Sequence, residues 1–236
     1  MRNFVAFIIS FVMLFSVCSF AFAEEVLPTP TPSPFPTIIP LPTPAPTPNQ
    51  KQPWDLKLIN EKHPISKSYK PKLKTTIQGK KVDVRIAKSL KNMINGARKA
   101  GYKMIITSSY RSAAYQQTLF NNKVNYWKKL GYILTEAINK AKTSVAEPGT
   151  SEYQYGLSVD IVSSKYRYLN AKQANQKGNK WLAKHCAEYG FIVRYPKDKQ
   201  NVTGIIYEPW HFRYVGISAA KTIMNKKITL EEYLGY

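Results

Sequence analysis

Cysteine is scarce in this sequence. Its 236 residues contain only two, Cys18 and Cys186, which excludes a small domain held together by several disulfides. We do not expect lipidation at Cys18, because the bulky Val17 stands where such sites prefer a small residue. If a leader is removed after Ala23 (see below), Cys186 alone remains, and one cysteine cannot form an internal disulfide.

Acidic residues are scarce as well: 14 Asp and Glu stand against 35 Lys and Arg, for a net charge of +21. Residues 54–236 carry the whole excess, because the residues before them hold two basic and two acidic side chains. No zinc finger or aromatic ribonucleoprotein motif accompanies the charge, so we do not expect nucleic acid as a partner. Two interpretations stay open: a solubilising basic face, or a surface for an anionic cell-wall polymer.

Hydrophobic residues are plentiful at 44%, which excludes a wholly disordered chain. A basic start, an apolar run over residues 4–22 and the small-x-small site Ala21-Phe22-Ala23 predict a secretory signal peptide at residues 1–23. The protein is therefore expected to be secreted or to lie in the cell wall. The alternative is an uncleaved anchor through residues 4–22, and only in that case do we expect contact with a membrane.

Proline is concentrated in one segment, with ten of the 16 prolines between Pro28 and Pro48. Proline fixes φ and removes backbone donors, so residues 24–53 are predicted to be an extended Pro/Thr-rich linker. At about 3.1 Å per residue it could reach roughly 90 Å and act as a spacer.

Residues 54–236 are long enough for one sizeable core. Apolar periodicity predicts helices at 86–100, 112–130, 133–145, 180–189 and 217–226, and strands at 103–108, 157–162 and 191–194. Residues 205–207 and 211–215 are interpreted as the arms of a further strand pair, and 148–151 as a loop. Because helices and strands do not alternate strictly, we expect one α+β domain with a small, mainly antiparallel sheet flanked by helices.

Polar chemistry concentrates at three places. In the first, Arg111 stands where a strand ends and a helix begins, with Gln116 one turn further. A guanidinium fork beside a helix N-terminus is a good carboxylate clamp. The alternative is a structural arginine next to a helix capped by a neighbouring serine.

The second place runs from Pro148 to Asp160. Asp160 lies between Val159 and Ile161 in an apolar strand, where an isolated carboxylate is costly unless it is paired or bound to a metal. A metal ligand and a salt bridge to Lys or Arg both remain possible.

The third place is Glu208-Pro209-Trp210-His211-Phe212-Arg213-Tyr214. Glu208 and His211 are close enough to touch one metal-bound water, which is the scheme of a zinc peptidase. The alternative for His211 is an aromatic side chain packed between Trp210 and Phe212.

Together, the three places resemble the VanY-type D-alanyl-D-alanine carboxypeptidases of the zinc D,D-peptidase family, over about Ala87 to Met224. The resemblance rests on three motifs of this sequence: Ser-Tyr-Arg-Ser followed by Gln, Pro-Gly-x-Ser-Glu-x-x-x-Gly-Leu-x-Val-Asp-Ile, and Glu-Pro-Trp-His-Phe-Arg-Tyr-Val-Gly.

The resemblance implies a zinc ion bound by a His, an Asp seven residues later and a second His, and it places Asp160 and His211 at two of these positions. It implies Glu208 as the catalytic base and Arg111 as the residue that stabilises the polarised carbonyl. Gln116 and Ser151 would help to hold the substrate. The implied reaction is hydrolysis of the terminal D-Ala from a peptidoglycan stem peptide.

The sequence departs from this pattern at Tyr153, which stands where the resemblance implies the first histidine. Neither His63 nor His185 falls on a ligand position. Tyrosine binds a metal as the phenolate, although its free pKa is near 10. Three hypotheses follow: a zinc carboxypeptidase with Tyr153 as an unusual ligand, a non-catalytic relative that binds peptidoglycan peptides, and a basic wall-adhesion module without a stem-peptide site.

Overall fold

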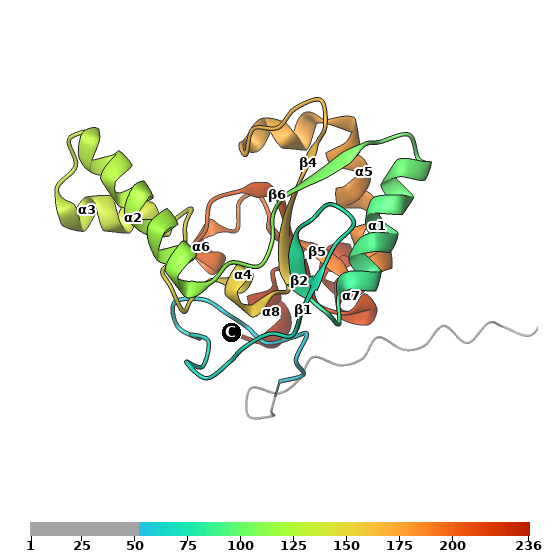
Figure 1. The fold of residues 1–236 in the computed structure, drawn as a ribbon, viewed down its shortest axis with the longest axis horizontal. Helices are drawn as coiled ribbons and strands as arrows, with labels where there is room; N and C mark the ends of the chain where they lie inside the picture. Colours follow the sequence, from blue (N-terminus) through green and yellow to red (C-terminus); the bar gives the residue numbers. More distant parts are fainter. Residues whose placement is uncertain (1–51) are drawn as a thin grey trace, which may run out of the picture. The chain divides into compact units, whose positions relative to one another are not determined.

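The computed structural model describes residues 52–236. The predicted signal peptide at 1–23 and nearly all of the predicted linker at 24–53 lie outside the described residues. Within 52–236 the expected α+β architecture is confirmed (Figure 1).

The centre of the domain is a four-stranded antiparallel sheet with strand order β3-β4-β6-β5. Its strands are β3 (Met104–Ser108), β4 (Ser158–Ser163), β5 (Phe191–Tyr195) and β6 (Glu208–Tyr214). A separate hairpin pairs β1 (Leu73–Thr75) with β2 (Lys81–Asp83), also antiparallel. The small antiparallel sheet expected from the sequence is therefore present.

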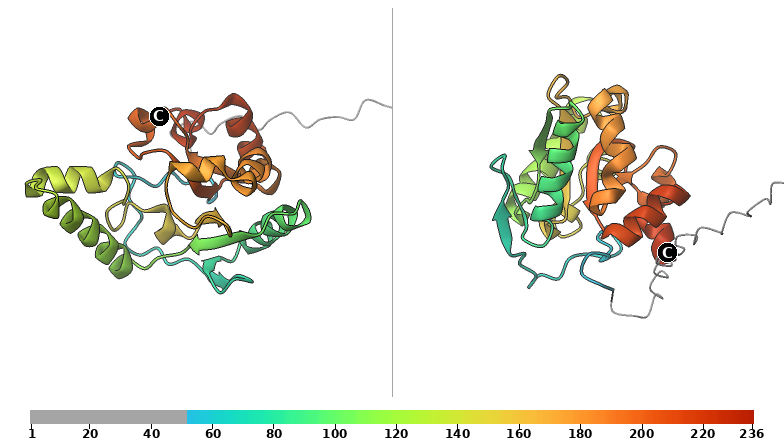
Figure 2. Two further views of the ribbon diagram at one scale, coloured as in Figure 1. Left: turned by 90° about the horizontal axis from the view of Figure 1, so that it is seen from above. Right: turned by 90° about the vertical axis from the view of Figure 1, so that its right-hand side faces the viewer.

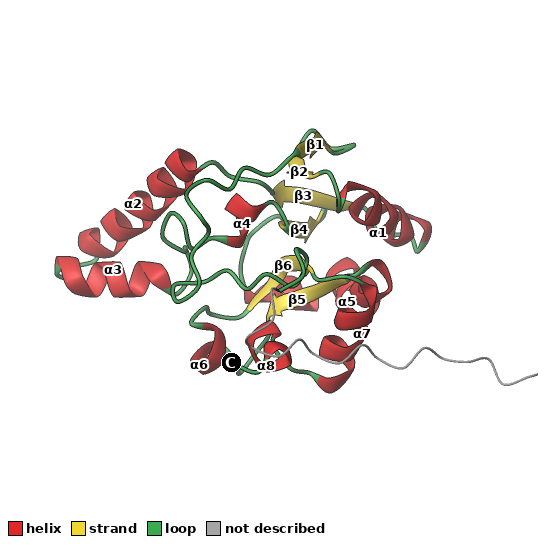
Figure 3. Cartoon of the chain, turned by 90° about the horizontal axis from the view of Figure 1, so that it is seen from below, coloured by secondary structure: helices red, strands yellow, loops and turns green. Residues whose placement is uncertain are grey.

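One face of the sheet is covered by α1 (Ala87–Lys99) and α5 (Lys177–His185), while α7 (Ile217–Lys226) packs along the edge strand β5 with Ile192 (Figures 1 and 3). The apolar stripe of α1 is fully buried in the main core together with Val159, Ile161 and Phe212 of the sheet. Because side chains alternate between the faces of a strand, the residues next to these three point to the opposite face. That opposite face carries the polar side chains of β4 and β6.

A helical hairpin of α2 (Ala113–Lys129) and α3 (Leu134–Lys142) projects from the other side of the domain (Figures 1 and 2). Its own small core is formed by Phe120, Val124, Ala137 and Ala141. The remaining short elements are α4 (Glu152–Tyr155), α6 (Gln200–Thr203), α8 (Leu230–Leu234) and the 3-10 turns η1 (Ala171–Asn175) and η2 (Cys186–Tyr189). No helix of residues 52–236 is long and apolar enough to span a membrane.

One expected element is wrong. Residues 205–207 form no strand, and β6 starts at Glu208 and pairs with β4 and β5 instead of with a preceding arm. Pro209 lies inside this central strand, where its missing N–H would break the ladder. The register of β5 against β6 shifts between Val193 and Tyr195, beside the pair Tyr195–Glu208, so the irregularity falls next to the proline.

Candidate functional site

The register of two strands places Asp160 and His211 side by side. They are directly opposite partners in the antiparallel pair of β4 and β6, so their side chains leave the same face of the sheet. This is the face away from α1 and α5. Both side chains are only 2% exposed. Nδ1 of His211 lies 3.7 Å from Oδ1 of Asp160.

Tyr153 reaches the same point from α4. This four-residue helix ends at Gly156, whose φ of 86° is left-handed and whose Cα faces the backbone of Asp83 so closely that a Cβ would lie 3.2 Å from its nitrogen. The Tyr153 hydroxyl donates a hydrogen bond to Oδ1 of Asp160 and lies 2.9 Å from Nδ1 of His211. The three residues that the sequence singled out as metal ligands therefore converge.

Glu208 and Arg111 complete the group. Oε2 of Glu208 lies 3.4 Å from Nδ1 of His211. Nη2 of Arg111 lies 3.6 Å from Oδ2 of Asp160, and its guanidinium stacks 3.7 Å from the centre of the Tyr153 ring. The Arg111 backbone N–H donates to the Tyr153 carbonyl at 3.2 Å, which ties the loop after β3 to α4.

The two expected substrate-binding residues also lie here. Gln116 accepts a hydrogen bond from Nη1 of Arg111 at 3.3 Å and donates one to the Ala146 carbonyl at 2.7 Å. It therefore orients Arg111 against the loop that precedes α4. Ser151 precedes α4 and is buried, but its side chain makes no capping hydrogen bond. All seven residues line one cavity of about 520 Å³: Arg111, Gln116, Ser151, Tyr153, Asp160, Glu208 and His211.

Burial and charge set the protonation states of this cluster. Burial, and then the negative charge of Asp160, raise the pKa of Tyr153 well above its usual value, so the phenol keeps its proton. Burial also raises the pKa of Glu208, against the opposing effect of His211. Burial opposes a charge on His211, but the carboxylates of Glu152, Glu208 and Asp160 outweigh it and raise the pKa of His211 to about 9.

The sequence did not predict a buried hydrogen-bond network next to the site, which is centred on Glu152. Its carboxylate is fully buried and accepts hydrogen bonds from Nε of Arg194 at 2.7 Å, Nη1 of Arg213 at 2.8 Å and Oγ of Ser158 at 2.9 Å. Burial works against this charge, but the two arginines lower the pKa of Glu152 well below its ordinary value.

This network touches the site at one point. Oε2 of Glu152 lies 3.6 Å from Nε2 of His211, a nitrogen without a hydrogen-bond partner among the described residues. Arg194 also pairs with Glu231 through two bonds of 2.8 and 2.7 Å. The sequence did contain a signal for this network, because Arg194 and Arg213 each lie among apolar residues of a strand. A charged side chain in such a strand needs a buried partner, and the same argument singled out Asp160.

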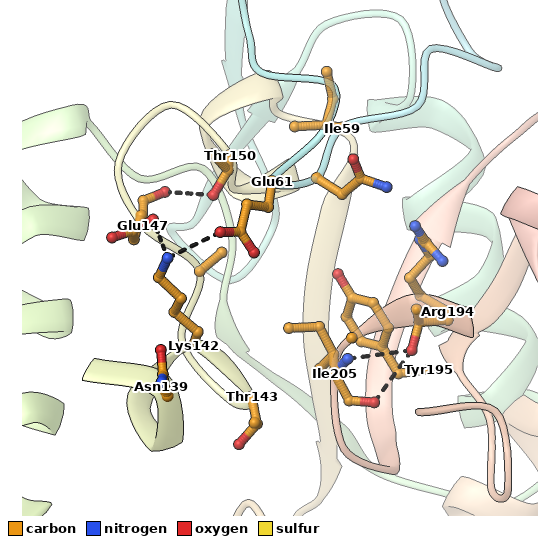
Figure 4. A pocket seen from close by; sticks show the side chains of 14 residues that line it. Ile59, Glu61, Asn139, Lys142, Thr143, Glu147, Thr150, Arg194, Tyr195 and Ile205 are labelled. Carbon is orange, nitrogen blue, oxygen red and sulfur yellow. Dashed lines mark hydrogen bonds and ion pairs between the residues drawn. The ribbon is translucent and has the colours of Figure 1, made fainter. Parts of the chain in front are cut away.

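A second cavity of about 320 Å³ adjoins the first (Figure 4). The two share Ala146, Tyr195 and Ile205 in their walls. Its charged side is Lys142, whose Nζ lies 2.9 Å from Glu61 and 3.1 Å from Glu147. His63 and His185 line neither cavity: the former packs on Tyr236 and the latter stacks on Trp181.

Two residues of the cluster, Asp160 and His211, have the spacing of metal ligands, and the third, Tyr153, is hydrogen-bonded to both. Ligands at about 2.0–2.1 Å from a tetrahedral zinc ion stand about 3.4 Å apart, close to the 3.7 Å between Asp160 and His211. The Tyr153 oxygen stands at hydrogen-bond distance from both, and its phenol is protonated. Residues 52–236 hold no group of three or more His, Cys, Asp or Glu side chains placed for a metal. In this arrangement Tyr153 acts as a hydrogen-bond donor, and its role as a third metal ligand stays a prediction.

Comparison with known proteins decides the family. The model of the family VanY, D-alanyl-D-alanine carboxypeptidase, matches residues 79–217, more than half of the chain. A D-alanyl-D-alanine carboxypeptidase of Enterococcus faecalis (strain ATCC 700802 / V583) is 41% identical over 187 residues, which cover 78% of this chain and 67% of that protein. This chain belongs to the VanY family of D-alanyl-D-alanine carboxypeptidases.

Solved VanY structures agree with this. VanYB in complex with D-alanine-D-alanine has a TM-score of 0.72 at 40% identity and covers 77% of this chain and 98% of its own. A VanY D,D-pentapeptidase mutant from the VanB-type resistance cassette, in complex with Zn(II), has a TM-score of 0.71 at 39% identity and covers 78% and 100%.

Membership of this family confirms the resemblance noted in the sequence. It also confirms the expectation of a peptidase of the D-alanyl-D-alanine carboxypeptidase type. That expectation fits the comparisons better than the non-catalytic alternative does. The chain spans about two thirds of the length of the curated relatives that it matches first. The roles of the individual site residues stay predictions.

Proposed function

We propose that this protein is a cell-wall hydrolase that removes the terminal D-Ala from peptidoglycan stem peptides, with zinc as its cofactor. The observation that carries the proposal is the convergence of Arg111, Asp160, Glu208 and His211 on one cavity of about 520 Å³. The D-alanine-D-alanine complex of a VanY relative supports the substrate, and the Zn(II) complex of another supports the metal.

The peptide is held at the Arg111 side of the cavity. Its guanidinium is partly exposed, so an incoming carboxylate or carbonyl oxygen can reach it. Gln116 fixes the direction of the guanidinium, and the Tyr153 ring supports its flat face. A planar fork of this kind pairs with two oxygens at once, which selects the end of a peptide over its middle.

Glu208 is the group suited to carry the proton. Burial raises the pKa of Glu208, and a carboxyl with a raised pKa is better able to accept a proton from water and return it to a leaving amine. It lies beside His211 in the cavity lining and begins β6, shortly after Ile205 and Ile206, which also line the cavity. Its role is therefore proton transfer at the scissile bond.

Zinc would be held by Asp160 and His211. In the present arrangement the Tyr153 hydroxyl bonds to both of their ligand atoms, so zinc uptake competes with two hydrogen bonds and with the proton on His211. We therefore propose a site that takes up zinc weakly and at higher pH.

The Tyr153 hydrogen bonds also favour a second candidate function, which is binding of stem peptides without cleavage. In that case the phenol takes the place of the ion and holds Asp160 and His211 together. Arg111 and Gln116 would still bind the peptide. The two candidates share a ligand and differ in turnover.

A peptide that ends in D-Ala-D-Ala separates the candidates when D-Ala release and peptide affinity are both measured, with zinc and with a chelator. Release that needs zinc and disappears in Glu208→Gln supports the hydrolase. Saturable binding without release supports the second candidate. Absence of both would contradict the assignment of this cavity as the substrate site.

We also propose, as the sequence predicts, that the protein acts outside the cytoplasm, exported by residues 1–23 and spaced by the linker 24–53. Its net charge of +21 supports adhesion to anionic wall polymers. Fractionation of cells that produce the full chain tests this: recovery in the wall or medium is expected, and recovery in the cytoplasm would contradict it.

A further inference from the structure

The end of the α2–α3 hairpin exposes a cluster of large aliphatic side chains. Leu130, Ile133 and Leu134 are 55%, 66% and 55% exposed, and they lie together where the chain turns from α2 into α3. The hairpin projects from the domain, and its turn is the part farthest from the sheet (Figures 1 and 2). We call residues 128–134 the hairpin tip.

Two basic side chains adjoin this apolar cluster. Lys128 and Lys129 form the last turn of α2 and are exposed. The hairpin from 113 to 142 contains five lysines and one acidic residue, a net charge of +4. An apolar end flanked by lysines is the pattern of a segment that meets an anionic bilayer, where long basic stems extend to the headgroups.

A layer of aromatic side chains lies directly beneath the tip. Trp127 packs edge-on against Tyr126 and Tyr132. Lys140 lies over both Trp127 and Tyr132, at 5.2 and 4.4 Å from the ring centres. Tryptophan and tyrosine favour the boundary between hydrocarbon and water, with an apolar ring and a polar edge. Along α2 the aliphatic side chains of the tip are thus followed by aromatic and basic ones, of which Tyr126 already lines the cavity.

We propose that the hairpin tip docks on an anionic lipid surface, with Leu130, Ile133 and Leu134 inserted below the headgroups and Lys128 and Lys129 at their level. A protein partner fits less well, because a stable interface needs about 800 Å² and 20 to 30 residues on each side, more than a seven-residue tip supplies. A soluble wall polyanion would use the lysines and leave the three aliphatic side chains in water.

Docking would set the height of the cavity above the lipid. The residues of α2 that line the cavity run from Gln116 to Tyr126, about 21 Å and about 6 Å of helical rise from Leu130 at the tip. The cavity would then face substrate close to the membrane and not throughout the wall. This contact is separate from residues 4–22, to which the sequence confined membrane binding, and it does not depend on the proposed hydrolysis.

The test uses the full chain with vesicles of phosphatidylcholine, alone or mixed with phosphatidylglycerol. Any anchoring by residues 4–22 occurs on both, so the difference reports the tip. Amide hydrogen exchange is followed across residues 126–136, and vesicle association is measured by flotation. We expect protection of the tip amides only with phosphatidylglycerol present, and loss of that lipid-dependent protection at high salt.

Two variants and two matched controls separate insertion from plain charge. The triple change Leu130→Ser, Ile133→Ser, Leu134→Ser should lower the phosphatidylglycerol-dependent association about tenfold or more, and Lys128→Gln with Lys129→Gln should lower it about fivefold per lysine. The controls are Ile77→Ser, an aliphatic side chain 62% exposed in the β1–β2 turn, and Lys88→Gln with Lys91→Gln on the exposed side of α1.

The controls should bind as the natural protein does, and all variants should keep its thermal unfolding midpoint because the changed side chains are exposed. Equal exchange of the tip amides on both lipids would overturn the proposal. So would a triple serine variant that binds normally while the lysine variant does not, since this would mean attraction by charge alone.

Discussion

The hydroxyl oxygen of Tyr153 lies 2.9 Å from Nδ1 of His211, and the same hydroxyl donates a hydrogen bond to Asp160. The phenol therefore joins a base and a carboxylate that leave the same face of the sheet from neighbouring strands. This bridge gives Nδ1 of His211 and Oδ1 of Asp160 a buried hydrogen-bond partner, and a metal ion bound by the two residues has to displace it.

Removing this hydroxyl should destabilise the domain. For Tyr153→Phe we expect the free energy of unfolding to fall by about 1–3 kcal/mol, because Asp160 loses a buried donor. Tyr155→Phe is the matched control, since both tyrosines are 8% exposed and the Tyr155 ring stacks on Tyr69. Denaturant unfolding of the metal-free protein measures both. Equal effects of the two changes would contradict the bridging role.

Substitution of the buried Glu152 should lower the stability of the domain more than substitution of an exposed glutamate. Glu152→Gln leaves Arg194 and Arg213 buried without their shared carboxylate, so we expect a loss of about 3–5 kcal/mol. Glu61→Gln breaks an exposed ion pair with Lys142 and should cost less than about 1 kcal/mol. The same unfolding experiment compares them, and a Glu152→Gln protein as stable as Glu61→Gln would refute this ranking.

Peptide affinity should depend on the shape of Arg111 and not only on its charge. Arg111→Ala should weaken binding of a D-Ala-D-Ala peptide by about 1.5–3 kcal/mol, roughly 10- to 150-fold. Arg111→Lys should recover only part of this, because an ammonium lacks the planar fork.

Calorimetric titration of the peptide gives these affinities. Lys123→Gln is the control, since Lys123 is a second cation that lines the same cavity. Its loss should weaken binding less than fivefold or so, as expected of a screened surface charge. A Lys123→Gln effect as large as that of Arg111→Ala would mean that the cavity attracts the peptide by charge alone.

The metal-free protein should lose stability in mildly alkaline solution. The pKa of His211 is raised to about 9, from about 6.5 in an unfolded chain, so the folded state binds its proton more tightly. This contribution is complete below about pH 6.5 and is lost as the pH rises through about 9. Imidazole resonances of His211 followed by NMR, with unfolding measured across the same range, test it. A His211 that titrates below pH 7 would contradict the surrounding carboxylate geometry.

Much of the fold could be predicted because it follows local periodicity. The stripe of α1 and the apolar run of β3 came from spacing alone, and both elements begin and end within one residue of the expectation. The strand expected at 205–207 was wrong because a strand there depends on long-range pairing, and β6 takes its partners from β4 and β5.

The site was predictable where a residue contradicted its local surroundings. Asp160 in an apolar strand could be explained only by a partner, and the structure supplies Tyr153, His211 and Arg111. Glu152 could not be singled out, because its partners come from β5 and β6, some 40 and 60 residues further along the chain. The orientation of the Tyr153 side chain could not be predicted either, because it depends on where α4 lies against the sheet.

The most direct measurement is the zinc dependence of D-Ala release from a D-Ala-D-Ala peptide, for the natural protein, for Tyr153→His and for Glu208→Gln. We predict that the natural protein releases D-Ala only at high zinc concentration, that Tyr153→His does so at much lower zinc, and that Glu208→Gln releases none. Peptide binding without D-Ala release by the natural protein at any zinc concentration would contradict the proposed hydrolysis.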